Sequence, residues 1–168
     1  MTQKSLFNGS GYAGYRVSLR LVREGYADYA PIVIACPHDV YEFMKELKDF
    51  DRERFYAICL DTRHQVVHCE EISSGSAERT VAHPRDVFKS AILSSSTGII
   101  LTHNHPSGDP APSPDDYDVT ERLYECGDLL GIEVLDHVII GRDEYFSFRD
   151  SGDIPKLARR HPPESGDL

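Results

Sequence analysis

The chain has 168 residues, 40% of them hydrophobic, which suits a single globular domain with a substantial core and leaves little room for a second one. Its formal net charge is -10 and it shows no basic stripe, so we do not expect direct, tight binding to nucleic acid. No apolar run is long enough for a membrane span, and the N-terminus lacks a signal-peptide core, so we expect a cytoplasmic protein. The four cysteines show no CxxC spacing, which is typical of free thiols in a reducing compartment.

The first third of the chain predicts a lead, two strands and a helix. Residues 1–14 are rich in turn-forming glycines and are predicted to be a flexible lead. Residues 15–22 alternate arginines with apolar side chains, which is typical of a half-buried strand with its arginines in solvent. A short strand is predicted over 31–35. Pro37 then begins a helix whose apolar positions share one face, namely Val40, Phe43, Met44 and Leu47.

The middle of the chain predicts a hairpin followed by a second helix. Strands are expected over 55–60 and 65–72, joined by a turn, and a Ser- and Gly-rich loop is expected over 73–76. The second helix begins near Pro84. Its predicted inner side consists of Val87, Phe88, Ala91 and Ile92.

Two histidines follow the next predicted strand. Residues 98–102 form a short apolar run, typical of a buried strand, that leads directly into His103. If the extended geometry continues, His103 and His105 are two residues apart and leave the same face, so both imidazoles can reach one ion. The segment 106–112 is rich in Pro and Gly and must turn.

A third helix is predicted directly after this turn. Ser113 is expected at its N-cap and Pro114 at its first position, with Asp116 three residues after the Ser, as in a capping box. Its apolar face is predicted to consist of Val119, Leu123, Cys126 and Leu130.

The spacing of His103, His105 and Asp116 predicts a metal site. Asp116 lies in the first turn of the helix, where a compact loop can bring it back toward the two histidines. Two His and one Asp, with a fourth position left for water, is the ligand set of a catalytic zinc rather than of a closed structural one. Asp109 and Asp115 flank the site and are alternative third ligands.

The last part of the chain completes the predicted sheet. Gly131 is expected to end the third helix, and strands are predicted over 132–140 and 145–148. Residues 151–168 have little hydrophobic content and are predicted to be a flexible tail, which leaves one domain over 15–150. The order of elements predicts an α/β fold, with a mixed β-sheet flanked by helices. His137, in the long strand, is expected to be either a hydrogen-bonded core residue or a ligand.

These motifs resemble a known family. The pattern His103-x-His105, seven residues, Ser113, two residues and Asp116 resembles the HxH(x7)SxxD signature of the JAMM (MPN-plus) metalloproteases. The longer run HNHPSGDPAPS resembles the RadC family of JAMM-like proteins, and similar segments extend over about residues 15–148. The resemblance implies the JAMM/MPN fold, which is similar to the cytidine-deaminase sandwich. The main departures are Asp86, where a Glu is usual, and the segment 76–78, in a loop that the resemblance sets beside the substrate groove.

The resemblance also implies catalytic roles. Glu53 matches the Glu that serves such sites as general base, and Glu70 and Glu71 are its competitors. Ser113 is implied as a hydroxyl donor to an oxyanion in addition to its role as N-cap. Asn104 is expected to orient the ligand loop or a histidine.

Three functions remain open on these grounds. The first is a Zn²⁺-dependent hydrolase that cleaves a peptide or isopeptide bond in a peptide or protein substrate, with His103, His105 and Asp116 as ligands, Glu53 as base and Ser113 at the oxyanion. The second is a DNA-repair-associated protein acting in a nucleic-acid complex, as the family's traditional label implies. The third is a binding module that a metal only stabilises. The sequence leaves the oligomeric state and the natural substrate open.

Overall fold

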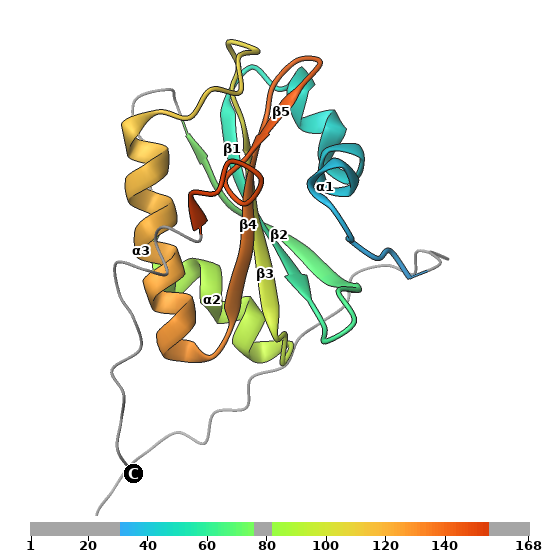
Figure 1. The fold of residues 1–168 in the computed structure, drawn as a ribbon, viewed down its shortest axis with the longest axis vertical. Coiled ribbons are helices and arrows are strands. Elements are labelled where there is room, and N and C mark those ends of the chain that lie inside the picture. Colours follow the sequence, from blue (N-terminus) through green and yellow to red (C-terminus); the bar gives the residue numbers. More distant parts are fainter. Residues whose placement is uncertain (1–30, 76–81, 155–168) are drawn as a thin grey trace, which may run out of the picture.

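The protein is an α/β sandwich in a computed structural model that describes residues 31–75 and 82–154 (Figure 1). One five-stranded sheet, in the order β2-β1-β3-β4-β5, has α2 and α3 on one side and α1 on the other. The elements are α1 (Pro37–Met44), a 3-10 helix η1 (Lys45–Asp49), β1 (Glu53–Leu60), β2 (Val66–Gly75), α2 (Pro84–Leu93), β3 (Gly98–Asn104), α3 (Pro114–Leu130), β4 (Glu133–Ile140) and β5 (Tyr145–Ser147). The predicted fold class, a mixed sheet flanked by helices, is confirmed.

The sheet mixes local and long-range pairing. β1 is antiparallel to both β2 and β3, and β4 is antiparallel to β5. β3 and β4 are parallel, and α3 provides the crossover that a parallel pair requires. The predicted hairpin is confirmed, but the predicted loop is wrong at 73–75, because these residues extend β2 and pair with the first residues of β1. The strand predicted over 31–35 is reduced to a single bridge between Val33 and Gln65.

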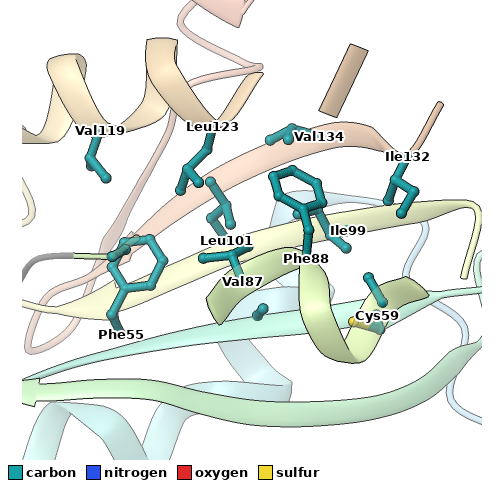
Figure 2. Packing of buried hydrophobic residues seen from close by; sticks show 13 residues of the cluster. Phe55, Cys59, Val87, Phe88, Ile99, Leu101, Val119, Leu123, Ile132 and Val134 are labelled. Carbon is teal, nitrogen blue, oxygen red and sulfur yellow. The ribbon is translucent and has the colours of Figure 1, made fainter. Parts of the chain in front are cut away.

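The core lies on both faces of the sheet. Figure 2 shows Phe88 of α2 and Leu123 of α3 directed at the strands, where they join a buried cluster with Ile99, Leu101 and Val134. On the other face, α1 and η1 cover a second cluster. Two predicted inner positions are wrong: Ile92 is 55% exposed and Leu130 is 49% exposed. Both lie in the last turn of their helix.

Several predicted segments fall outside the described residues, namely the lead 1–14, the strand 15–22, the loop residues 76–78 and most of the tail. Of the predicted tail, residues 151–154 are described, and Ile154 is buried against Ile139 and Phe148. Gly131 ends α3 in the left-handed region with φ 66°, as expected for a C-cap. Within residues 31–75 and 82–154, no helix combines the length and the apolar character that a membrane span requires.

A buried carboxylate ties β5 to the sheet. Asp136 of β4 is 3% exposed, and one of its oxygens accepts the hydroxyl hydrogen of Ser147 at 2.7 Å. Its other oxygen accepts the backbone N–H groups of His137 at 2.7 Å and Arg149 at 3.0 Å. Burial outweighs these hydrogen bonds and raises the pKa of Asp136 to about 6.

This pKa predicts how stability depends on pH. Raising the pKa from 3.8 to about 6 stabilises the protonated form, so the contribution is present below pH 3.8 and is lost as the pH rises through about 6. Asp136→Asn keeps the shape but cannot ionise. We therefore expect its free energy of unfolding, relative to the unchanged protein, to rise by up to roughly 3 kcal/mol between pH 4 and pH 8. Urea unfolding of both proteins at several pH values measures this difference, and a difference that falls or stays constant would contradict it.

Candidate metal centre

The candidate metal centre begins at the end of β3. This strand lies between β1 and β4, and all of its residues are buried, so His103 is fully enclosed. His105 follows directly after the strand and is held by two backbone groups. Its N–H donates to the carbonyl of Ile140 at 3.1 Å, and its Nδ1 lies 2.8 Å from the carbonyl of Asp109. Because a carbonyl only accepts, Nδ1 of His105 carries the hydrogen and its Nε2 presents a lone pair.

Asp116 comes from the first turn of α3. Ser113 is the N-cap of this helix and Pro114 its first residue, so the sequence signals of a helix start are all used. One carboxylate oxygen of Asp116, Oδ2, accepts from the backbone N–H of Ser113 at 2.7 Å and from its hydroxyl at 2.6 Å. The other, Oδ1, lies 3.1 Å from Nε2 of His103. The capping box thus aims Asp116 at the histidines.

Glu53 is brought to the same place by strand pairing. It is the first residue of β1, and the register of β1 on β3 sets Phe55 opposite His103. Its Oε1 lies 3.5 Å from Nε2 of His103, and 18% of its side chain is exposed. Asn104 holds the backbone on both sides of Glu53, because its side chain accepts from the N–H of Arg54 at 2.9 Å and donates to the carbonyl of Arg52 at 3.0 Å. Asn104 therefore orients the Glu53 segment, a role that its position in the sequence did not predict.

The spacing of the donor atoms fits a small divalent cation. Glu53, His103, His105 and Asp116 each offer one donor atom, and these atoms lie within 4.8 Å of one another. Zinc bonds of 2.0–2.1 Å at tetrahedral angles separate neighbouring ligand atoms by about 3.3 Å. The Nε2 atoms of the two histidines are 3.1 Å apart. Oδ1 of Asp116 lies 3.1 Å from Nε2 of His103, and Oδ2 lies 3.5 Å from Nε2 of His105. The donor set, two imidazoles and carboxylates, is one that zinc accepts.

Burial and neighbouring groups shift the pKa values at this centre in opposite directions. Burial favours the neutral form of each group, yet the neighbouring imidazoles of His103 and His105 and the hydroxyl of Ser113 hold the pKa of Asp116 well below the usual range. Burial likewise lowers the pKa of His105, but the hydrogen bond to Asp116 and that to the carbonyl of Asp109 outweigh it and raise the pKa. A proton and a cation therefore compete for the same lone pair of His105.

Comparison with known proteins shows the family of the chain. A sequence model of the RadC-like JAB domain matches residues 34–153 of the chain. The chain belongs to the RadC family. The five-stranded mixed sheet and its helices are consistent with the JAB/MPN-type fold of that domain. Membership of this family therefore accounts for the fold of the chain.

The curated relatives carry the name UPF0758 protein. The chain is 48% identical to one from Methanosarcina barkeri over 120 residues, which are 71% of this chain and 52% of that protein. It is 44% identical to one from Geobacillus thermodenitrificans over 141 residues, 83% of this chain and 62% of that protein. One from Thermotoga maritima is 45% identical over 115 residues, 68% of this chain and 52% of that protein. The chain thus matches between half and about three fifths of the length of these relatives.

The other candidate residues of this RadC-family site lie apart from the four donors. Among the described residues, the group that can hold a metal does not include Glu70, Glu71, Asp109 or Asp115. Glu71 accepts from the hydroxyl of Tyr56 at 2.6 Å, and Asp109 accepts from the N–H of Ala111 at 2.9 Å. The carboxylates of Glu71 and Asp109 therefore serve local structure.

His137 lies behind the site rather than in it. It is fully buried, its Nε2 is 2.8 Å from Nδ1 of His103, and its Nδ1 is 2.6 Å from the hydroxyl of Thr120. Burial lowers its pKa well below the ordinary value. The expectation of a hydrogen-bonded core residue is confirmed, although its partner is the histidine at the site. Thr120 was missed in the sequence; its place four residues after Asp116, on the same helix face, is the signal that marks it.

A substitution at Asn104 tests how Glu53 is held. Asn104→Ala leaves the N–H of Arg54 and the carbonyl of Arg52 without their buried partner, so we expect a loss of about 1–3 kcal/mol in the free energy of unfolding. Asn104→Asp retains the acceptor for Arg54 but sets a carboxylate oxygen against the carbonyl of Arg52 and buries a charge, so it should also be less stable than the unchanged protein. Urea unfolding measures the stability of all three proteins. Equal stability of Asn104→Ala and the unchanged protein would show that the clamp is not needed.

The competition at His105 predicts a pH dependence of metal binding. Since its pKa is raised above 6.5, protonation already begins to displace a cation above that pH. We expect the apparent affinity for Zn²⁺ to fall as the pH is lowered from 8 to 6, by up to about tenfold per pH unit for each proton displaced. Titration against a chromophoric chelator at fixed ionic strength measures this affinity. A zinc affinity that is constant over this range would contradict the assignment of His105 as a ligand.

Proposed function

We propose that this RadC-family chain is a zinc-dependent hydrolase that cleaves a peptide or isopeptide bond. The observation that carries the proposal is the spacing of the donor atoms of His103, His105 and Asp116, which matches neighbouring ligands of one tetrahedral ion. Glu53 stands beside them with a partly exposed carboxylate. A structural zinc site would usually be closed by four ligands that are mostly cysteines, and no cysteine belongs to this group.

The proposed chemistry divides between the ion and the protein. A zinc ion held by these residues would supply Lewis acidity, which polarises a carbonyl group and makes a hydroxide nucleophile accessible near neutral pH. Glu53 would take the proton of the attacking water at Oε1 and pass it to the leaving nitrogen. Its place at the start of β1, clamped by Asn104, holds that carboxylate beside the ligands.

Ser113 would donate a hydrogen bond to the developing oxyanion. In the structure its hydroxyl donates to Oδ2 of Asp116 at 2.6 Å, so this role requires the hydroxyl to turn. Ser113 is exposed and stands at the positive end of α3, where a negative charge is stabilised. The helix start would thus contribute to the site both through its dipole and through the Ser113 side chain.

The net charge favours a peptide or protein substrate over nucleic acid. A formal charge of -10 opposes the close approach of a phosphate backbone. We expect action in the cytoplasm, where the free thiols of the four cysteines would stay reduced. A salt-dependent affinity for DNA would instead favour a protein that works in a repair complex.

Two substitutions test the proposal together. Glu53→Gln keeps the size of the side chain but cannot accept a proton, so the variant should bind Zn²⁺ and lose cleavage by about 10²-fold or more. His103→Ala should lose both zinc and cleavage. Zinc content is measured by elemental analysis, and cleavage by mass spectrometry of a proteome-derived peptide library incubated with the zinc-loaded proteins.

The variants separate two roles of Glu53. If Glu53→Gln loses zinc along with activity, Glu53 is a fourth ligand and not the base. If it cleaves peptides as fast as the unchanged protein, the proposed mechanism is wrong. If His103→Ala retains zinc, the ion is held elsewhere.

A further inference from the structure

A line of hydrogen bonds runs from the metal centre into the core and returns to it. Nδ1 of His103 lies 2.8 Å from Nε2 of His137. Nδ1 of His137 lies 2.6 Å from the hydroxyl oxygen of Thr120, which lies 2.5 Å from the backbone carbonyl of Asp116. The line therefore begins at one candidate ligand and ends at another, and its two intermediate side chains are fully buried.

The carbonyl at the end of the line decides where the protons lie. A carbonyl only accepts, so the single hydrogen of the Thr120 hydroxyl points at Asp116. The Thr120 oxygen must then accept from Nδ1 of His137, which leaves Nε2 of that neutral ring without a hydrogen. Nε2 in turn accepts from Nδ1 of His103. These positions of the hydrogen atoms do not depend on a bound cation.

The hydrogen bond between His137 and His103 determines the tautomer of His103 at the metal centre. A neutral imidazole carries one hydrogen, and Nδ1 of His103 holds it. Nε2 of His103 therefore presents a bare lone pair to Asp116 and His105, as a metal ligand requires. The opposite order would place a hydrogen on Nε2, at the point where a cation would bind. It would also leave two oxygens, of Thr120 and Asp116, 2.5 Å apart with no hydrogen between them.

We propose that Thr120 and His137 are positioning residues that hold His103 in the tautomer able to bind a cation. Thr120 accepts the hydrogen bond from Nδ1 of His137, and Nε2 of His137 then accepts the hydrogen bond from Nδ1 of His103. Aromatic rings keep the imidazoles in place: Phe148 stacks on His137 with centroids 5.1 Å apart, and Phe55 stacks on His103 at 5.8 Å. The inference rests on the metal-binding part of the proposed function, not on the substrate.

Two substitutions of Thr120 separate this role from simple packing. Thr120→Val keeps the branched shape and removes the hydroxyl, so we expect the affinity for Zn²⁺ to fall by about 10–100-fold. Thr120→Ser keeps the hydroxyl and removes a methyl group, so it should bind zinc nearly as well as the unchanged protein. Packing alone predicts the reverse order, because Val fills the space and Ser leaves a gap. A Thr120→Val variant that binds zinc as tightly as the unchanged protein, or more tightly than Thr120→Ser, would overturn the proposal.

The tautomers can also be read without any substitution. Two-dimensional ¹⁵N spectra of the imidazole groups in the metal-free protein should show His137 with its hydrogen on Nδ1 and a bare Nε2. A hydrogen on Nε2 of His137, or on both nitrogens, would overturn the proposal. Failure of the unchanged protein to bind zinc would instead overturn the proposed function, since the nitrogen spectrum reports the direction of the line in either case.

Discussion

The candidate metal centre depends on one carboxylate that serves two structures at once. Asp116 completes the capping box of α3 through Oδ2, which accepts from the N–H and the hydroxyl of Ser113. Through Oδ1 it faces Nε2 of His103 at 3.1 Å. The capping box that stabilises the start of α3 therefore also brings an anionic oxygen to the histidines. The two histidines and the hydroxyl of Ser113 keep this largely buried carboxylate ionised, and the helix N-terminus is a favourable place for its negative charge.

The sheet supplies the rest of the geometry. β3 is buried between β1 and β4, and its register with β1 brings Glu53 within 3.5 Å of His103. Asn104, the last residue of β3, then clamps the backbone on both sides of Glu53. A fully buried strand thus fixes the first histidine, while the proposed base stands at the first residue of the neighbouring strand, where 18% of its side chain is exposed. This division allows a preorganised ligand set and an accessible reacting group.

The sequence predicted those parts of the site that follow local rules. His103 and His105 share a face because they are two residues apart at the end of a strand, and the start of α3 was marked by Ser113, Pro114 and Asp116. Glu53 was reached only through the family resemblance, because the register between β1 and β3 is a long-range property. The contact of His137 with Thr120 joins residues 17 positions apart and was not foreseen. Ser73 and Leu130 were misplaced for related reasons: pairing with β1 extended β2, and the helix periodicity of α3 continued past its packed part.

The central claim is that His103, His105 and Asp116 hold one divalent cation with a position left open. Crystals of the zinc-loaded protein, measured at the zinc absorption edge, test it directly through the anomalous difference map. We expect a single peak within about 2 Å of Nε2 of His103, Nε2 of His105 and one carboxylate oxygen of Asp116, with no fourth protein ligand. A peak at any other place, or an ion closed by four protein side chains, would contradict it.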